Sequence, residues 1–258
     1  MLGLSLRLVL SAAALTLALP LAAQTPTPAA PVQPVAPLHP APPPTPAKPA
    51  PQLDWPNLAR FHQADLDLAP ATGNESRVVF MGDSITQGWH LDQSFPGKPY
   101  VNRGISGQTS PQMVLRFHQD VIALQPKVVI LLAGTNDVAE NTGPITAEET
   151  VNNIAAMAEM ATANGIRVVL CSVLPAYDFG WRKGLEPAAK IVALNKLIRA
   201  YAEAHNYPYV DYYAAMKDDR GGLPETLSRD GVHPLPAGYA VMAPLAEAGI
   251  EQALKAKR

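Results

Sequence analysis

The sequence has little cysteine, little charge and few aromatic residues. Cys171 is the single cysteine among 258 residues, which excludes an intramolecular disulfide and any thiolate cluster for zinc or iron–sulfur. Charged residues make up 16% and the formal net charge is −2, so the chain lacks the positive footprint of a nucleic-acid-binding protein. No residues show metal-ligand spacing, and we expect neither a metal nor a cofactor. Cys171 itself is expected to be a small buried hydrophobe.

An apolar segment at the start of the sequence predicts export. Arg7 is the only charged side chain in residues 1–23, and residues 8–19 are rich in Leu and Ala. Ala23 offers a small residue for cleavage, so residues 1–23 are predicted to be a signal peptide. The alternative is an uncleaved anchor, because the segment is nearly long enough to span a bilayer. Export without disulfides favours a periplasmic or secreted bacterial protein that has no membrane span after cleavage.

Proline is concentrated in one segment. Twelve of the 27 prolines fall in residues 25–51, interleaved with Ala, Thr and Val. Such a stretch favours extended polyproline II, so residues 24–52 are predicted to be a disordered spacer. The domain is therefore predicted to span residues 53–258.

Short apolar runs alternate with helical patterns in that domain. We expect strands at 77–81, 100–102, 127–132, 167–171 and 209–212, and helices at 110–124, 148–164, 188–205 and 236–256. Ser110 and Pro111 are predicted to be the cap and first residue of the first of these helices. Continuous apolar strands separated by helices predict a parallel sheet covered on both faces, an α/β/α sandwich.

Polar residues follow three of these strands directly. Asp83 and Ser84 follow the first, Asn102 ends the second, and Asn136 and Asp137 follow the third. Each could be a helix cap. Because the carboxyl ends of parallel strands share one sheet edge, where such folds bind ligands, their coincidence there predicts a site.

A serine nucleophile at this edge needs a base. Among six histidines, His233 is the best candidate, since Asp230 precedes it by three residues in a loop. That carboxylate can bond Nδ1–H and leave Nε2 free for Ser84. His90, which closely follows the Ser84 turn, remains an alternative base.

Four blocks together resemble the SGNH hydrolase superfamily, the GDSL-type lipases and esterases. The blocks are Gly-Asp-Ser-Ile-Thr at 82–86, Asn-Arg-Gly-Ile-Ser-Gly at 102–107, Gly-Thr-Asn-Asp at 134–137 and Asp-x-x-His at 230–233. They occur in the family's order and spacing over residues 75–255. Ile85 stands where the founding pattern has leucine, which affects only the subfamily.

The resemblance implies a role for each matching residue. Ser84 would be the nucleophile, His233 the base and Asp230 its orienting carboxylate. The Ser84 and Gly104 backbone N–H groups and the Asn136 side-chain amide would form the oxyanion hole.

The similar flavodoxin-like strand order, 2-1-3-4-5, offers a geometric check. It places the first three polar blocks on adjacent strands. The fifth strand then lies about 14 Å from the first at roughly 4.8 Å per spacing. Residues 213–230 are long enough to bring His233 back across the sheet.

These features predict a serine esterase that hydrolyses short acyl esters, with O-acetyl groups on carbohydrate as the favoured substrate. Candidate substrate contacts are Asp83, Trp89, Tyr177 and Trp181. Arg103 would either touch an anionic substrate or, the interpretation we favour, pair with a carboxylate such as Asp83. Alternatives are a lysophospholipase or thioesterase, an acyltransferase, and a non-catalytic carbohydrate-binding module. The sequence predicts no oligomeric state.

Overall fold

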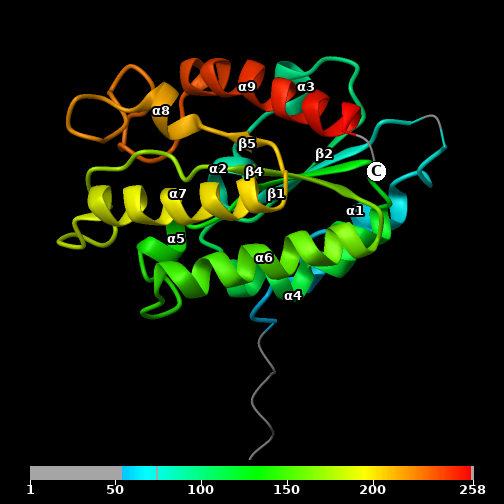
Figure 1. Ribbon diagram of the computed structural model, residues 1–258, viewed down its shortest axis with the longest axis horizontal. Coiled ribbons are helices and arrows are strands. Elements are labelled where there is room, and N and C mark those ends of the chain that lie inside the picture. Colours follow the sequence, from blue (N-terminus) through cyan, green and yellow to red (C-terminus); the bar gives the residue numbers. More distant parts are fainter. Residues whose placement is uncertain (1–53, 74, 257–258) are drawn as a thin grey trace, which may run out of the picture. The chain divides into compact units, whose positions relative to one another are not determined.

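A five-stranded parallel sheet lies at the centre of the computed structural model, which describes residues 54–73 and 75–256 (Figure 1). The strands are β1 (Val78–Gly82), β2 (Tyr100–Gly104), β3 (Val128–Leu132), β4 (Arg167–Cys171) and β5 (Tyr209–Val210). Their order is β2-β1-β3-β4-β5 with every pair parallel, which confirms the predicted topology. The predicted signal peptide and proline-rich spacer lie outside the described residues.

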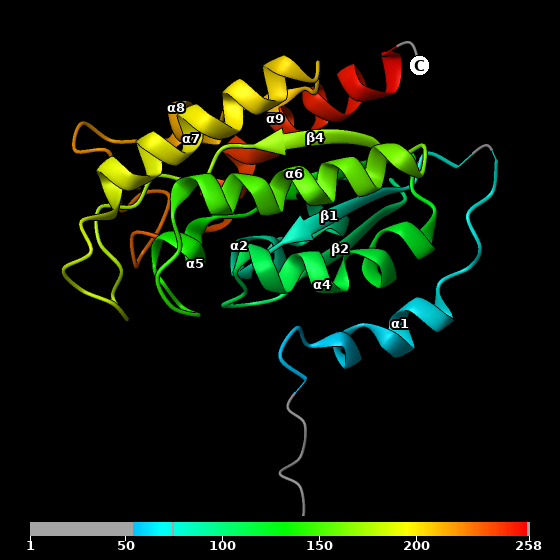
Figure 2. The same ribbon diagram turned by 60° about the horizontal axis from the view of Figure 1, so that its bottom comes forward.

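Helices alternate with these strands and cover both faces of the sheet. They are α1 (His62–Asp67), α2 (Ser84–Gln87), α3 (Leu91–Ser94), α4 (Ser110–Asp120), α5 (Thr135–Val138), α6 (Ala147–Ala163), α7 (Pro187–Ala204), α8 (Tyr212–Met216) and α9 (Pro236–Lys255). On one face α4, α6 and α7 pack apolar side chains such as Phe117, Met157 and Leu194 against the strands. Figure 2 shows α4 and α6 side by side on that face. On the other face α9, with α2, α3 and α8, buries Met242 and Ile250. The result is the predicted α/β/α sandwich.

The strands are apolar because both of their faces are covered. All five residues of β1 and of β3 are buried, which explains their continuous hydrophobic runs. Cys171, the last residue of β4, is buried as expected, and burial raises the pKa of its thiol.

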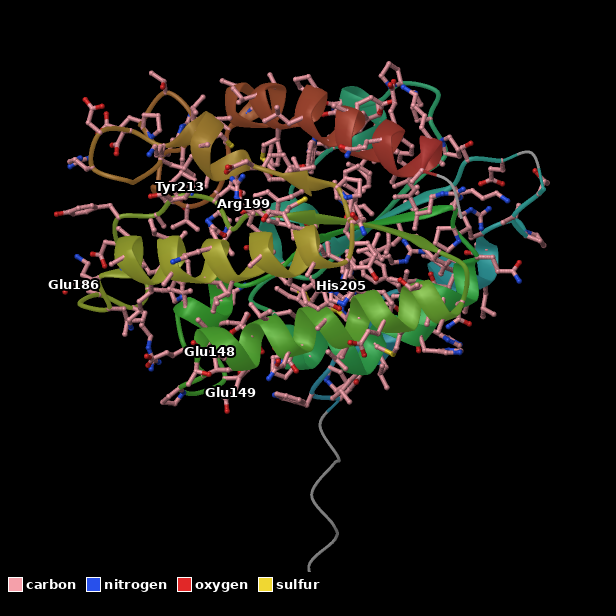
Figure 3. The ribbon with its side chains drawn as sticks, viewed as in Figure 1. Glu148, Glu149, Glu186, Arg199, His205 and Tyr213 are labelled. Atoms are coloured by element: carbon pink, nitrogen blue, oxygen red, sulfur yellow. The ribbon has the colours of Figure 1, made fainter. Side chains whose placement is uncertain are left out.

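Helix boundaries depend on local capping, and α6 illustrates this. Thr146 Oγ1 accepts a 3.1 Å hydrogen bond from the Glu149 N–H, and the Glu149 carboxylate accepts one of 2.8 Å from the Thr146 N–H. Glu148 and Glu149, both in the first turn (Figure 3), also place negative charge near the positive end of the helix dipole. Among residues 54–73 and 75–256, no helix combines the length and apolar character needed to cross a membrane.

The helix predicted at 110–124 corresponds to α4, and the prediction was wrong at both ends. The N-cap of α4 is Thr109, which forms a capping box with Gln112, so Ser110 is the first helical residue. The helix ends at Asp120, and a separate 3-10 turn covers Ile122–Leu124.

The fifth strand is shorter than predicted. Asp211 caps α8 by accepting a 2.9 Å hydrogen bond from the Ala214 N–H, so the chain turns into a helix directly after Val210. Tyr212, predicted at the end of the strand, belongs to α8 and is buried.

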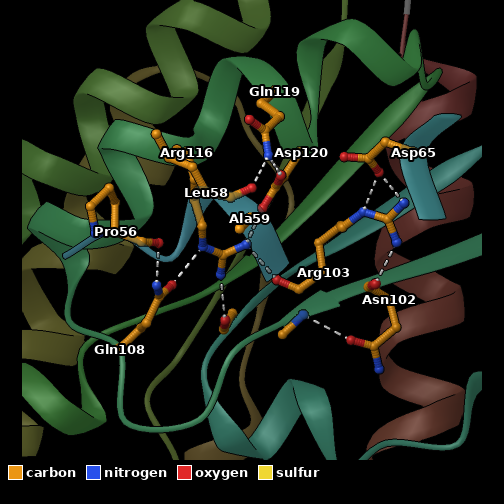
Figure 4. Close-up of polar contacts among 12 residues, drawn as sticks. Pro56, Leu58, Ala59, Asp65, Asn102, Arg103, Gln108, Arg116, Gln119 and Asp120 are labelled. Atoms are coloured by element: carbon orange, nitrogen blue, oxygen red, sulfur yellow. Dashed lines mark hydrogen bonds and ion pairs between the residues drawn. The ribbon is translucent and has the colours of Figure 1, made fainter. Parts of the chain in front are cut away.

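The segment that leads into β1 was not predicted to be structured, yet it packs on the sandwich (Figure 4). Its backbone carbonyls accept hydrogen bonds from two glutamine side chains. Gln108, just before α4, donates to the Pro56 carbonyl, and Gln119 of α4 donates to the Leu58 carbonyl. In α1, Asp65 forms an ion pair with Arg103 of β2. These contacts attach residues 54–67 to the edge of the domain.

Candidate active site

Ser84 begins α2 directly after β1. Its Oγ lies 2.8 Å from Nε2 of His233, which is 149 residues further along the chain. Asp83 caps the helix through a 2.9 Å hydrogen bond that its Oδ1 accepts from the Ile85 N–H. The turn requires glycine at position 82, because a Cβ there would lie 2.1 Å from Thr86 Oγ1. The strand-to-helix turn thus presents the serine hydroxyl at the carboxyl edge of the sheet.

Asp230 fixes the imidazole of His233. Its Oδ2 lies 2.6 Å from His233 Nδ1, and its Oδ1 accepts from the backbone N–H groups of Val232 and His233 and from Ser228 Oγ. Partial burial acts to raise the pKa of Asp230, but the hydrogen bonds from His233 and Val232 outweigh it and hold that pKa well below its ordinary value. An ionised carboxylate at Nδ1 leaves Nε2 to face Ser84.

After β5 the chain crosses back over the sheet to bring His233 to Ser84, as the strand order requires. From β5, three strands away from β1, it passes through α8 and a loop that ends in an isolated bridge between Ser228 and Pro234. The Leu235 N–H donates to the Leu227 carbonyl over 2.7 Å and closes this loop around Asp230 and His233.

Asn136, in the second position of α5, lies beside Asp83. Its Nδ2 donates to the Gln108 carbonyl over 3.0 Å and to Asp83 Oδ2 over 3.3 Å, and all three residues are buried. Burial raises the pKa of Asp83 to about 7, against the lowering effect of the Ile85 N–H and of nearby His233. The amide that the family resemblance assigns to an oxyanion hole therefore faces the residue before the serine.

Gly104 ends β2 against the backbone of α2. A Cβ at this position would lie 2.1 Å from the Gln87 nitrogen, so only glycine allows this approach. The Gly104 N–H donates to Asn102 Oδ1 over 2.8 Å, while Asn102 Nδ2 donates to the carbonyls of Thr86 and Trp89. Asn102 thus joins the end of β2 to α2.

The structure shows where His90 and Arg103, two residues with open alternatives, lie. His90 is the N-cap residue of α3, and the imidazole that meets Ser84 is that of His233. Arg103 does pair with a carboxylate, but the carboxylate is Asp65 rather than Asp83, and its guanidinium lies 4.7 Å from the Phe61 ring centroid. The sequence did not reveal Asp65 as the partner of Arg103, because Asp65 belongs to α1, a helix that was not predicted.

The four candidate substrate contacts lie in different surroundings. Trp89 is 3% exposed, packs between Phe80 and Tyr239 and donates to Ser94 Oγ, so most of its indole belongs to the core. Asp83 is likewise buried and bonded within the site.

The other two candidates are exposed. Trp181 is 48% exposed, and its ring centroid lies 6.1 Å from that of His233. Tyr177 is 58% exposed, with the Arg220 guanidinium 5.2 Å from its ring centroid. Trp181 therefore lies beside the imidazole of His233.

Several residues of the site carry no sequence signal. Three of them form hydrogen bonds with Asp230 or Asn136: Ser228, Gln108 and Asn141. None belongs to a motif or has a periodic spacing, so only the folded chain reveals them. In the part of the chain that the structure describes, no three His, Cys, Asp or Glu side chains gather as a metal-binding group.

Comparison with known proteins assigns the chain to a family. Among curated proteins, an acetylxylan esterase of Geobacillus stearothermophilus is 31% identical over 203 residues, 66% of this chain and 92% of the relative. An uncharacterized lipoprotein of Bacillus subtilis is 26% identical over 164 residues, 56% of this chain, and the match spans 59% of that relative's length.

Among solved structures, a GDSL-like lipase from Bacteroides thetaiotaomicron is 46% identical with a TM-score of 0.75, covering 77% of this chain and 99% of that chain. Residues 80–241, well over half of the sequence, match the GDSL-like lipase/acylhydrolase family. The fold, the sequence blocks and these matches agree, and the chain belongs to the GDSL-like lipase/acylhydrolase family, within the SGNH hydrolase superfamily.

Proposed function

We propose that this carboxylic ester hydrolase is a serine esterase in which Ser84 is the nucleophile, His233 the general base and Asp230 the carboxylate that orients His233. The observation that carries the proposal is the continuous chain of hydrogen bonds from Ser84 Oγ through His233 to Asp230, with distances of 2.8 and 2.6 Å. A serine hydroxyl is a weak nucleophile until an adjacent base accepts its proton, and this geometry supplies that base.

The reaction has two steps. Ser84 Oγ attacks the ester carbonyl carbon while its proton passes to His233 Nε2. The tetrahedral intermediate then expels the alcohol, which takes that proton and leaves an acyl-serine. Water attacks the acyl carbon with His233 again as base, and the carboxylic acid leaves as Ser84 regains its proton.

Three donors would hold the oxyanion of each intermediate. The Ser84 N–H, at the first residue of α2, has no acceptor within the helix. The Asn136 Nδ2 bond to Asp83 is long at 3.3 Å, so an oxyanion of normal hydrogen-bond length competes well for that donor. The Gly104 N–H would be shared between the oxyanion and Asn102.

We further propose a short acyl group on a carbohydrate as the substrate. The side chains of His233 and Asp230 are 41% and 52% exposed, so the site lies open at the surface, where a bulky alcohol can approach. The exposed indole of Trp181 beside His233 gives a flat apolar face on which a sugar ring can stack. The relative named as an acetylxylan esterase is consistent with this choice.

One observation favours a second candidate, a lysophospholipase or thioesterase that accepts a longer acyl chain. A cavity of about 500 Å³ between α3 and the start of α9 begins one residue after His233. It is lined mainly by apolar groups, including Trp89, Pro234, Leu235 and Tyr239. An acyl chain that reached it would gain from its burial.

The test is hydrolysis of p-nitrophenyl acetate, butyrate and octanoate and of an acetylated xylo-oligosaccharide by the full chain. We expect turnover to fall with acyl length and to vanish in Ser84→Ala, while Ser106→Ala, which alters an exposed serine, keeps it. Turnover that rises with acyl length supports the second candidate. A folded chain without Ser84-dependent turnover on any ester contradicts the esterase and favours a carbohydrate-binding module. Product analysis with an added alcohol distinguishes acyl transfer from hydrolysis.

We also propose that the chain is exported, on the strength of the apolar segment that ends near Ala23. Mass spectrometry of the protein recovered from outside the cytoplasm of a bacterial host tests this. We expect a mature chain that begins after Ala23, whereas an intact N-terminus in the membrane fraction indicates a retained anchor.

A further inference from the structure

The side chain of Asn136 can hold an oxyanion in only one of its two orientations. Its amide presents a donor, Nδ2, on one side and an acceptor, Oδ1, on the other, and rotation by 180° exchanges them. Nδ2 faces the Gln108 carbonyl and Asp83, while Oδ1 accepts a hydrogen bond of 2.8 Å from Nδ2 of Asn141. The Asn141 bond is the shortest of the three.

Asn141 is itself held in one orientation from two sides. Its Nδ2 also donates to the Gly107 carbonyl over 3.2 Å, and its Oδ1 accepts from the Trp181 indole N–H over 3.1 Å. The Asn141 backbone N–H donates to the Asn136 carbonyl over 3.0 Å, which places the two side chains together. The indole N–H can only donate, so it requires Oδ1 of Asn141 on its side and Nδ2 on the side of Asn136.

Trp181 is in turn fixed on the loop that follows β4. Its ring packs 5.1 Å from that of the buried Phe179, and the adjacent Arg182 forms an ion pair with Glu140, next to Asn141. The loops after β4 and after α5 are thereby joined at two neighbouring points.

The exposure of Trp181 and Asn141 distinguishes a role in the active site from a role in folding. Trp181 and Asn141 both lie at the surface, where hydrogen bonds contribute little to folding because water replaces the lost partner. The bonds nevertheless run in series toward a buried amide beside Ser84. Hydrogen bonds in series polarise one another, so the bond to Oδ1 strengthens Nδ2 as a donor.

We propose that Asn141 and Trp181 are positioning residues that act in series: the Trp181 N–H orients the Asn141 amide, which orients and polarises Asn136 for oxyanion binding. The inference rests on the proposed function, because Asn136 must be an oxyanion donor for its orientation to affect turnover. Neither residue touches the reacting atoms, so their effect is on kcat through Asn136.

A double-mutant cycle on the full chain tests the series. Asn141→Leu keeps the size of the side chain and removes its hydrogen bonds, and Trp181→Phe keeps an aromatic ring beside His233 and removes the N–H. With p-nitrophenyl acetate we expect each to lower kcat by about threefold to tenfold, the effect of one hydrogen bond, with KM and the thermal midpoint nearly unchanged. Trp181→Phe should lower kcat no further in Asn141→Leu, and Asn141→Leu no further in Asn136→Ala.

Two matched variants serve as controls. Trp55→Phe alters another exposed tryptophan, and Asn164→Leu alters an exposed asparagine whose Nδ2 bonds the Met160 carbonyl at the end of α6. Both should keep the wild-type kcat.

Several outcomes overturn the proposal. They are an unchanged kcat in Asn141→Leu, independent effects of the two substitutions that multiply in the double variant, and a change confined to KM, which would make Trp181 a substrate contact alone. Failure of the proposed function is distinct, since it appears as turnover that survives Ser84→Ala.

A second measurement does not depend on turnover. In ¹⁵N-labelled protein the side-chain NH₂ resonances of Asn136, assigned through their loss in Asn136→Ala, should shift in Asn141→Leu and in Trp181→Phe. Resonances that stay in place contradict the coupling.

Discussion

The carboxylate of Asp83 and the side-chain amide of Asn136 face each other across 3.3 Å in the buried space beside Ser84. The pair joins the turn after β1 to the turn after β3, two strands that are neighbours in the sheet. The contact is longer than most N–H···O hydrogen bonds, and it leaves a buried acidic group with few donors. This arrangement has consequences for stability as well as for turnover.

The stability of the protein should depend on pH through Asp83. Burial raises its pKa from 3.8 to about 7, so the folded state binds this proton more tightly than the unfolded state does. The stabilising contribution is fully present below about pH 4 and is lost as the pH rises to about 7. At about 1.4 kcal/mol per pH unit, the loss is about 4 kcal/mol.

Urea unfolding of wild type and Asp83→Asn at pH 5 and pH 8 measures this contribution. The asparagine does not titrate, so the difference in unfolding free energy between the two proteins should favour the variant more at pH 8 than at pH 5. Asp120, whose pKa burial also raises, titrates in both proteins and cancels in the comparison. A difference that does not vary with pH would show that Asp83 is already ionised at pH 5.

Replacement of Asn136 should affect turnover more than binding. Asn136→Ala removes a donor whose proposed partner, the oxyanion, exists only in the transition state and the tetrahedral intermediates. We expect kcat for p-nitrophenyl acetate to fall by about 10²–10³ with little change in KM. Steady-state kinetics beside a circular dichroism spectrum provide the measurement. A kcat within tenfold of wild type would leave the oxyanion to the two backbone donors.

Most of the sheet was predictable because its sequence signal is local. Continuous apolar residues at 128–132 and 168–171 are buried on both faces, and both strands lie within one residue of the expected bounds. The end of β5 was not predictable in the same way. Tyr212 and Tyr213 suit a strand, and only the cap at Asp211 turns the chain into a helix.

The candidate site likewise contains residues with a local sequence signal and residues without one. Ser84 and His233 belong to blocks whose spacing is recognisable, and the structure brings their side chains together. The nearness of Trp89 to Ser84 in the sequence does not show the direction of its side chain, which turns toward the core after the four-residue α2. Asn141 has no signal at all, since hydrogen bonds between loops leave no pattern in the sequence.

A buried ion pair beneath the site should be sensitive to loss of its cation (Figure 4). Arg116 is fully buried, bonds the Asp120 carboxylate over 2.8 Å and donates to the carbonyls of Gly82 and Arg103. Arg116→Met leaves the buried Asp120 carboxylate, two backbone carbonyls and the Gln108 side-chain carbonyl without this partner. We expect the unfolding free energy to fall by about 3–5 kcal/mol in urea titrations at pH 7.

Two further variants decide the cause of that loss. Arg182→Met removes the cation of an exposed pair with Glu140 and should change the free energy by less than about 1 kcal/mol. Arg116→Met combined with Asp120→Asn should recover part of the loss, because the uncompensated charge is gone. No recovery would assign the cost to the carbonyls instead.

The substitution Asp230→Asn separates two roles of the Asp230 carboxylate, which shapes its loop and orients the His233 imidazole. Oδ1 accepts three hydrogen bonds that shape the loop, and an asparagine oxygen can accept them equally well. Oδ2 accepts from His233 Nδ1, and there the variant presents an NH₂ group instead. The imidazole would then carry its proton on Nε2 and could not accept one from Ser84. We expect the fold to be kept and kcat to fall by up to about 10⁴.

The tautomer of His233 can be measured directly, which makes the cause of this loss testable. In ¹⁵N spectra of the imidazole, wild type should show the proton on Nδ1 and Asp230→Asn should show it on Nε2 in the neutral form. Asp230→Ala provides the contrast, because it removes both sets of bonds and should also lower the thermal midpoint. If Asp230→Asn kept the wild-type tautomer and still lost turnover, the carboxylate would act by its charge on the imidazolium rather than by orienting the ring.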